Sequence, residues 1–185
     1  MLPGGGSFVE TGYTLYSMKA FKSLILGTLV LLSAAGCTAQ EVPSPQGLTS
    51  FLYQLQDADI EAIVASGFGL VVMDYSQDGS DEERYLPEEI ARFTEHGIVA
   101  LAYLSIGEAE DYRFYWEEAW DADHDGVPDP GAPAWLGRSN PDWVGNYKVR
   151  YWDLAWQAIV LSYLDEILSQ GFSGVYLDIV DAFEY

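Results

Sequence analysis

The stretches that decide the fold are SGFGLVVMD (66–74), HGIVALAYLS (96–105) and QGFSGVYLD (170–178). Each follows a helical pattern and passes through a glycine, at its second position, into an apolar strand. A glycine is favoured there because the residue that ends a helix often adopts a left-handed conformation. The strands are apolar throughout instead of alternating, which is typical of parallel strands covered on both faces. Alternating helices and parallel strands predict an α/β fold.

The segments between these stretches indicate which α/β architecture to expect. An opening strand is predicted at 51–55, a helix begins near Pro87, and Asp153 is the predicted N-cap of the third and strongest helix. A doubly wound sheet and a (β/α)8 barrel share this local pattern. The glycine-rich phosphate-binding turn of a nucleotide-binding sheet is missing after the first strand, where residues 54–57 read QLQD. The sequence therefore favours a TIM-barrel type fold, of which it holds the first four β/α units.

The N-terminal fifth of the chain has the pattern of an export signal. A short basic segment begins at Met18, an apolar run follows at 24–32, and Ala-Ala-Gly precedes Cys37, the only cysteine. A bacterial lipoprotein signal places its lipidated cysteine in this position, whereas the alternative is a buried, inert thiol. The predicted divisions are an over-extended start (1–17), a lipoprotein signal peptide (18–36), a tether (37–47) and a partial barrel domain (48–185).

Composition and charge exclude several functions. The chain carries a net charge of −21, and Cys37–Tyr185 alone keeps six basic and 28 acidic residues, a charge near −22. Such a chain repels nucleic acid and anionic lipid and attracts cations or polycations. We therefore expect no nucleic-acid partner and membrane contact only through the lipid anchor. The predicted location is the cell envelope, in the periplasm or at the cell surface.

Carboxylates stand where a barrel collects its reactive groups, at the carboxyl ends of the strands. Asp74 follows the second strand, Glu108 follows the third, and Asp178 lies inside the apolar pattern of the last one. Two carboxylates that face a sugar acetal can cleave it. The alternative for Asp178 is a helix cap or an ion pair with Arg113 or Arg150.

An acidic motif, DADHDGVPD at 121–129, resembles the start of a calcium-binding loop. The twelfth position, where such a loop has its bidentate glutamate, is Ala132. The motif predicts either a weak structural calcium site or a solvated acidic loop, and no cofactor is required by the expected chemistry. The predicted calcium ligands are Asp121, Asp123, Asp125 and Asp129.

Three long motifs, YLSIGEAEDYRFYW (103–116), NPDWVGNYKVRYWD (140–153) and GFSGVYLDIVDAFEY (171–185), resemble glycoside hydrolase family 114. Its members are TIM-barrel proteins described as endo-α-1,4-polygalactosaminidases. The resemblance implies that Asp178 is a catalytic carboxylate, with Glu108 as the second one predicted in this chain. The residues expected to bind substrate are Asp74, Tyr75, Tyr103, Arg113, Tyr147, Arg150, Trp152 and Asp181.

The resemblance also indicates a fragment, since the family's other proposed acid lies on a later strand and a barrel needs about 250 residues. The expected function is a lipid-anchored hydrolase of an amino-sugar polysaccharide, whose cationic polymer would suit the acidic chain. One alternative is a non-catalytic glycan-binding lipoprotein that uses the tryptophan-rich insertion at 106–147, with Trp120 and Trp143 as its platform. The other alternative is an inactive truncated product.

Overall fold

The computed structural model describes residues 48 and 50–184. The predicted signal peptide and the lipidation site at Cys37 lie outside these residues, as do the start at 1–17 and the tether at 37–47. Within the described part, no helix is long and apolar enough to cross a membrane. Its elements are β1 (Leu52–Tyr53), α1 (Ile60–Ala65), β2 (Leu70–Met73), α2 (Pro87–Glu95), β3 (Val99–Ser105), β4 (Glu108–Glu110), η1 (Glu118–Trp120), β5 (Leu136–Asn140), β6 (Trp143–Val149), α3 (Leu154–Ser169), β7 (Gly174–Asp178) and η2 (Ala182–Glu184).

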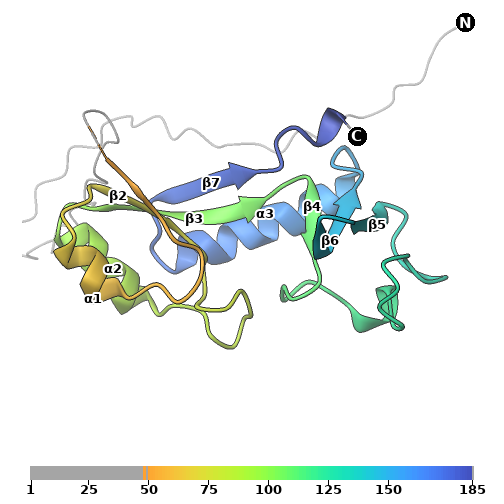
Figure 1. Ribbon diagram of the computed structural model, residues 1–185, viewed down its shortest axis with the longest axis horizontal. Coiled ribbons are helices and arrows are strands. Elements are labelled where there is room, and N and C mark those ends of the chain that lie inside the picture. The colour runs from red at the N-terminus through yellow and green to blue at the C-terminus, as the bar shows by residue number, and fades with distance from the viewer. Residues whose placement is uncertain (1–47, 49, 185) are drawn as a thin grey trace, which may run out of the picture. The chain divides into compact units, whose positions relative to one another are not determined.

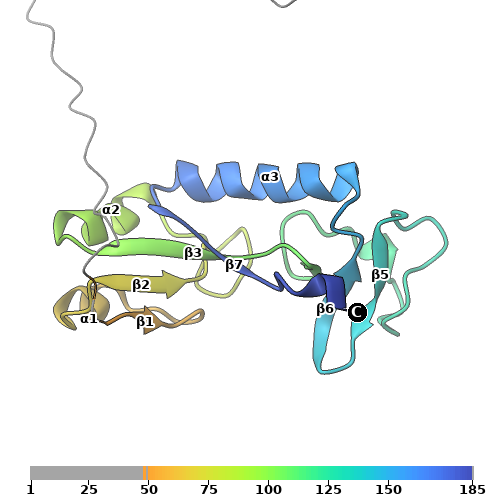
Figure 2. The ribbon, with the colours of Figure 1, turned by 90° about the horizontal axis from the view of Figure 1, so that it is seen from above.

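The main sheet has four parallel strands in the order β1-β2-β3-β7 (Figure 1). This spatial order follows the order along the chain without reversal. A doubly wound sheet reverses its order at the switch point, whereas a barrel adds each new strand beside the previous one. The predicted α/β fold of TIM-barrel type is therefore confirmed. Figure 2 shows β1, β2 and β3 side by side, with α3 running alongside the sheet.

The helix ends follow the predicted chemistry. Gly67, Gly97 and Gly171 all have positive φ angles, of 81°, 71° and 94°, which only glycine adopts without strain. Asp153 is the N-cap of α3, and its carboxylate accepts a hydrogen bond from the backbone N–H of Ala155 at 2.9 Å. These ends fix the lengths of the helices and hence the points at which the strands begin.

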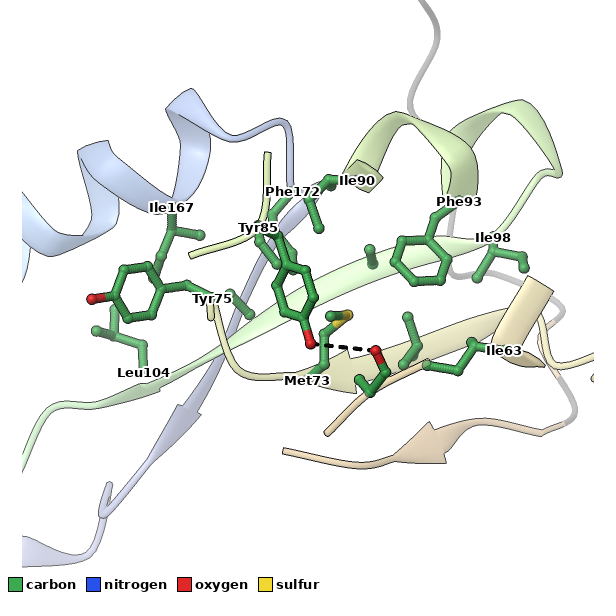
Figure 3. Close-up of a cluster of buried hydrophobic side chains, with 14 of the residues drawn as sticks. Ile63, Met73, Tyr75, Tyr85, Ile90, Phe93, Ile98, Leu104, Ile167 and Phe172 are labelled. Carbon is green, nitrogen blue, oxygen red and sulfur yellow. Dashed lines mark hydrogen bonds between the residues drawn. The ribbon is translucent and has the colours of Figure 1, made fainter. Parts of the chain in front are cut away.

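The core lies between the sheet and its helices (Figure 3). Met73 of β2, Phe93 of α2 and Ile167 of α3 are fully buried within it. A second cluster, which includes Trp120, Trp135 and Trp156, packs the insertion against α3. Trp120 and Trp135 of the insertion are buried in this cluster, so part of the aromatic insertion serves as core.

The structure differs from the prediction in two segments. The opening strand is limited to Leu52–Tyr53 instead of 51–55, because only these two residues pair with β2. The segment 106–147, predicted as a long loop, contains most of an antiparallel sheet with the order β4-β6-β5. The pattern of parallel strands gave no signal for this sheet, since none of its strands is apolar throughout.

The outer side of β7 is open in the described part of the chain. Tyr176 and Leu177 are 42% and 48% exposed, although they belong to a strand whose sequence is apolar on both faces. Leu161 of α3 is also exposed, at 60%. In a closed barrel such a strand and helix are covered by the next β/α unit.

We expect Gln170→Ala to lower the free energy of unfolding by about 1–3 kcal/mol, because it removes two buried hydrogen bonds. The Nε2 atom of Gln170 donates to the carbonyl oxygens of Tyr75, at 2.9 Å, and Tyr85, at 2.8 Å. Gln157→Ala is the matched control, since its amide donates to a single carbonyl in an exposed setting. Denaturant unfolding of both variants measures the difference, and equal losses would contradict the assigned role of Gln170.

Candidate active site

A cavity of about 730 Å³ lies at the carboxyl ends of the parallel strands. The end of a parallel sheet where the strands finish is the usual place for reactive groups in this architecture. Of the residues predicted from the sequence, the structure brings five to the cavity: Asp74, Tyr103, Glu108, Arg113 and Asp178. The other lining residues on which the argument below depends are Asp78, Glu110, Tyr112, Trp143 and Asn146.

Asp178 is the last residue of β7 and faces the cavity, where it is partly exposed. It pairs in register with Ser105 at the end of β3. The hydroxyl group of Tyr103 donates a hydrogen bond to its Oδ2 atom at 2.9 Å. Burial, together with the nearby carboxylates of Glu110 and Asp178, raises the pKa of Tyr103. The phenol therefore keeps its proton and acts as a donor that orients Asp178.

Arg113 holds the floor of the cavity together. Its side chain is fully buried, and its guanidinium donates to both oxygens of Asp74 at 2.8 Å and to Glu110 Oε2 at 2.5 Å. It also donates to the carbonyl oxygen of Gly79 at 3.2 Å and lies 4.8 Å from the ring centre of Tyr112. Three chain segments thus meet at one side chain.

The electrostatics of this cluster follow from its burial. Burial raises the pKa of Glu110, and the charge and hydrogen bond of Arg113 oppose that rise. Burial alone would lower the pKa of Arg113, but Glu110 and Asp74 outweigh it, so the pKa of the guanidinium lies above its usual value. A permanently charged guanidinium is therefore the group on which the two buried carboxylates depend.

Glu108 lies in the cavity wall, yet its side chain is bonded to protein groups. The residue is fully buried, and its two carboxylate oxygens accept hydrogen bonds from the amides of Asn140, at 2.8 Å, and Asn146, at 3.3 Å. Both asparagines belong to the small sheet. The motif NPDWVGN at 140–146 contains these partners, but sequence spacing gives no sign that they reach Glu108.

The cavity is strongly acidic. Its lining residues include the five carboxylates of Asp74, Asp78, Glu108, Glu110 and Asp178, but a single cation, Arg113. The guanidinium is already paired with two of the five. The remaining charge favours a cationic ligand.

Other predicted residues lie away from this cavity. Tyr75 is buried in the core, with its ring 5.0 Å from that of Tyr163. The hydroxyl of Tyr147 donates to Asp121 Oδ2 at 2.5 Å, within the insertion. Arg150, Trp152 and Asp181 are exposed and are not among the residues that line the cavity.

The acidic loop at 121–129 brings three of its four predicted calcium ligands together. Oxygen atoms of Asp121, Asp123 and Asp129 lie within 4.8 Å of one another. Asp125 is not part of this group, and its carboxylate accepts from the N–H of Val127. Burial acts to raise the pKa of Asp121, but the donors around it, chiefly Tyr147 OH, outweigh that effect and lower it. The carboxylates thus help to fold their own loop, and calcium binding stays a prediction.

Comparison with known proteins identifies relatives along most of the chain. Residues 32–185 match the model of glycoside-hydrolase family GH114. An uncharacterized protein of Thermotoga maritima is 51% identical over 168 residues, which are 91% of this chain and 50% of that protein. An uncharacterized protein of Methanocaldococcus jannaschii is 53% identical over 133 residues, which are 72% of this chain and 36% of that protein. The chain spans about half, or less, of the length of these relatives.

Two solved structures share the fold. A variant of the glycoside hydrolase domain of PelA from Pseudomonas aeruginosa has a TM-score of 0.53 at 20% identity, covering 75% of this chain and 47% of that chain. Aspergillus fumigatus Ega3, in complex with galactosamine, has a TM-score of 0.51 at 21% identity and covers 80% of this chain and 49% of its own. At these identities the likeness shows the fold alone.

Replacing Arg113 with methionine should destabilise the protein by about 3–5 kcal/mol at neutral pH, because two buried carboxylates lose their shared partner. Glu110 then loses the group that opposes the rise in its pKa. A carboxyl group whose pKa is raised on folding stabilises at pH values below its unfolded pKa, about 4, and destabilises as the pH rises. The loss should therefore be smaller at pH 4 than at pH 7.

Thermal or denaturant unfolding at both pH values measures this dependence. Arg84→Met serves as the control, because Arg84 pairs with Asp81 and Glu166 at the surface, with nearly half of its side chain exposed. We expect a cost of at most about 1 kcal/mol for it. A pH-independent loss in Arg113→Met would show that the cluster stabilises by packing and not by charge.

Proposed function

Because the chain belongs to glycoside hydrolase family GH114, we propose that the protein hydrolyses an amino-sugar polysaccharide and that Asp178 is a catalytic carboxylate. The observation that carries this proposal is the position of Asp178. It stands at the carboxyl end of β7, opens onto an acidic cavity and is oriented by the hydroxyl of Tyr103. An ionised carboxylate held in one orientation can act as nucleophile or base at a sugar acetal.

Three of the other described carboxylates of the cavity are less suited to that role, and the fourth, Asp78, accepts a hydrogen bond from the backbone N–H of Ser80 in the loop after β2. Asp74 and Glu110 are buried and paired with Arg113, and the oxygens of Glu108 are occupied by two amides. Asp178 is more exposed than these three. Acid–base chemistry needs a carboxylate that can reach a bound substrate. The proposal therefore assigns the reaction to Asp178 and the other three to the architecture of the cavity.

The acidity of the cavity supports an amino sugar as substrate. A hexosamine with a free amino group carries a positive charge at neutral pH, and its polymer is a polycation. Five carboxylates line the cavity against one arginine, and the whole chain has a net charge of −21. Such a field attracts a cationic chain and raises its local concentration. The galactosamine in the structure of Ega3, which shares the fold, is in line with this proposal.

Export belongs to the same proposal. The basic, apolar and small-residue segments at 18–36 support secretion, and Cys37 supports a lipid anchor. The enzyme would then act in the cell envelope, in the periplasm or at the surface, where polysaccharides occur. Its contact with the membrane would be through the lipid alone.

We expect Asp178→Asn to reduce hydrolysis of partly deacetylated α-1,4-galactosamine polymer by about 10²–10⁴-fold, the size of an acid–base contribution. Product formation is measured by the release of reducing ends in the complete gene product that carries this chain. Asp165→Asn, on the exposed side of α3, removes the same charge elsewhere and should leave the rate unchanged. Both variants should keep the unfolding temperature of the wild type.

Two outcomes would contradict the proposal. Full activity in Asp178→Asn would show that another group carries the chemistry. Binding of the polymer without any release of reducing ends, in the wild type and the variant alike, would favour the glycan-binding lipoprotein instead.

A further inference from the structure

The first two residues of β6, next to the β5–β6 turn, are exposed apolar residues beside the cavity. Trp143 is 68% exposed and Val144 is 93% exposed, and both line the cavity. Of the other tryptophans of the insertion, Trp120 and Trp135 are less than 10% exposed, and Trp116 does not line the cavity. Large apolar side chains at the rim of a polar cavity are typical of a binding surface. Trp143 is therefore the tryptophan of the insertion that is available to a ligand in this cavity.

The hairpin that carries Trp143 is held firmly through both of its strands. The amides of Asn140, on one strand, and Asn146, on the other, both donate to the buried carboxylate of Glu108. The backbone N–H of Asp111 donates to the carbonyl of Gly145 at 2.9 Å. Gly145 has a φ of 93°, and a Cβ atom there would lie 2.9 Å from Asp111 Oδ1. The position of the hairpin tip is thus fixed by the contacts of its strands with Glu108 and Asp111.

We propose that Trp143 is a sugar-stacking residue at the rim of the cavity and that Glu108 is the positioning residue that holds it there. The ligand is a hexosamine unit of the polymer whose neighbouring unit lies over Asp178, so this inference rests on the proposed function. Glu108 thereby receives a role distinct from the catalytic one predicted from the sequence.

The chemistry of the ligand fits an indole in this place. One face of a hexose ring is made of C–H groups, which pack against the flat face of an aromatic ring. The indole ring is also the best aromatic partner for a cation. An ammonium group on the sugar would then lie between the indole and the acidic cavity. A neutral oligosaccharide of the same length would still stack on the indole but would lose the part of the binding free energy that comes from charge.

The first test compares Trp143→Ala with Phe51→Ala, which truncates an aromatic residue that is 60% exposed and does not line the cavity. Calorimetric titration of the complete gene product with a defined galactosamine oligomer measures affinity. We expect a weakening on the order of tenfold for Trp143→Ala and no change for Phe51→Ala. The unfolding temperature should be the same in both variants and the wild type.

Three results would overturn the role of Trp143. Unchanged affinity in Trp143→Ala overturns the inference while the proposed function stands, because the wild type still binds and cleaves. A lowered unfolding temperature with unchanged affinity would assign Trp143 to packing against another segment. A wild type that neither binds nor cleaves the oligomer would refute the proposed function, and the inference with it.

The second test separates a positioning role of Glu108 from a catalytic one. In Glu108→Gln, an NH2 group replaces one carboxylate oxygen and faces the NH2 group of an asparagine. Two donors cannot form a hydrogen bond, so the hairpin tip should lose its fixed position. We expect KM to rise and kcat to change little. In the Trp143→Ala background, Glu108→Gln should add nothing further, since coupled residues are not additive.

Asn140→Ala is a second variant that disturbs the same hydrogen bond and leaves the carboxylate in place. It should raise KM in the same way as Glu108→Gln. If Glu108→Gln instead slowed turnover by a factor of about 100 or more, whether or not Trp143 is present, Glu108 would be catalytic and its positioning role would be overturned.

Discussion

The described structure depends most on one buried cation. Arg113 joins Asp74 at the end of β2, the carbonyl of Gly79 in the next loop and Glu110 on β4. The parallel sheet and the small antiparallel sheet meet at this guanidinium. Burying the charges of Arg113, Asp74 and Glu110 costs desolvation free energy, which only well-aligned hydrogen bonds can offset. The bidentate pair between Arg113 and Asp74 supplies such hydrogen bonds. A cluster of this kind contributes more to the fixed shape of the cavity than to net stability.

The parallel part of the fold could be predicted because local signals there agree with one another. A glycine at each helix end, an apolar strand after it and Asp153 before α3 all point to the same units. The order of the strands in the sheet then follows from the barrel rule. The small sheet gave no such agreement. Its strand β5, Leu136–Asn140 with the sequence LGRSN, has neither an apolar run nor alternation, and it pairs with β6 through register shifts.

The residues of the site divide in the same way into those that the sequence predicted and those that it did not. Asp178 was found because a charged residue inside an apolar strand is exceptional, and Asp74 because it follows one directly. Asn140 and Asn146 could not be assigned, since they reach the cavity through a fold of the insertion for which the sequence shows no periodicity. Trp143 was named only for the alternative, non-catalytic function. Tyr75 was misplaced for a simpler reason. It follows Asp74 in the sequence, but successive residues point to opposite sides, and the side of Tyr75 is the core.

Charge and shape therefore have separate sources in this cavity. The charge comes from the ends of the parallel strands and the segment that follows β3, where Arg113 compensates only two of five carboxylates. The apolar rim comes from the inserted hairpin, which Glu108 connects to the same wall. Charge acts over a distance of about 8–10 Å at ordinary salt and draws in any polycation. A stacked ring acts only in contact, so it sets where along the polymer a unit stops. A cavity with negative charge alone would bind a cationic chain in many positions. The hairpin, through the stacking ring of Trp143, is the element that selects one of them.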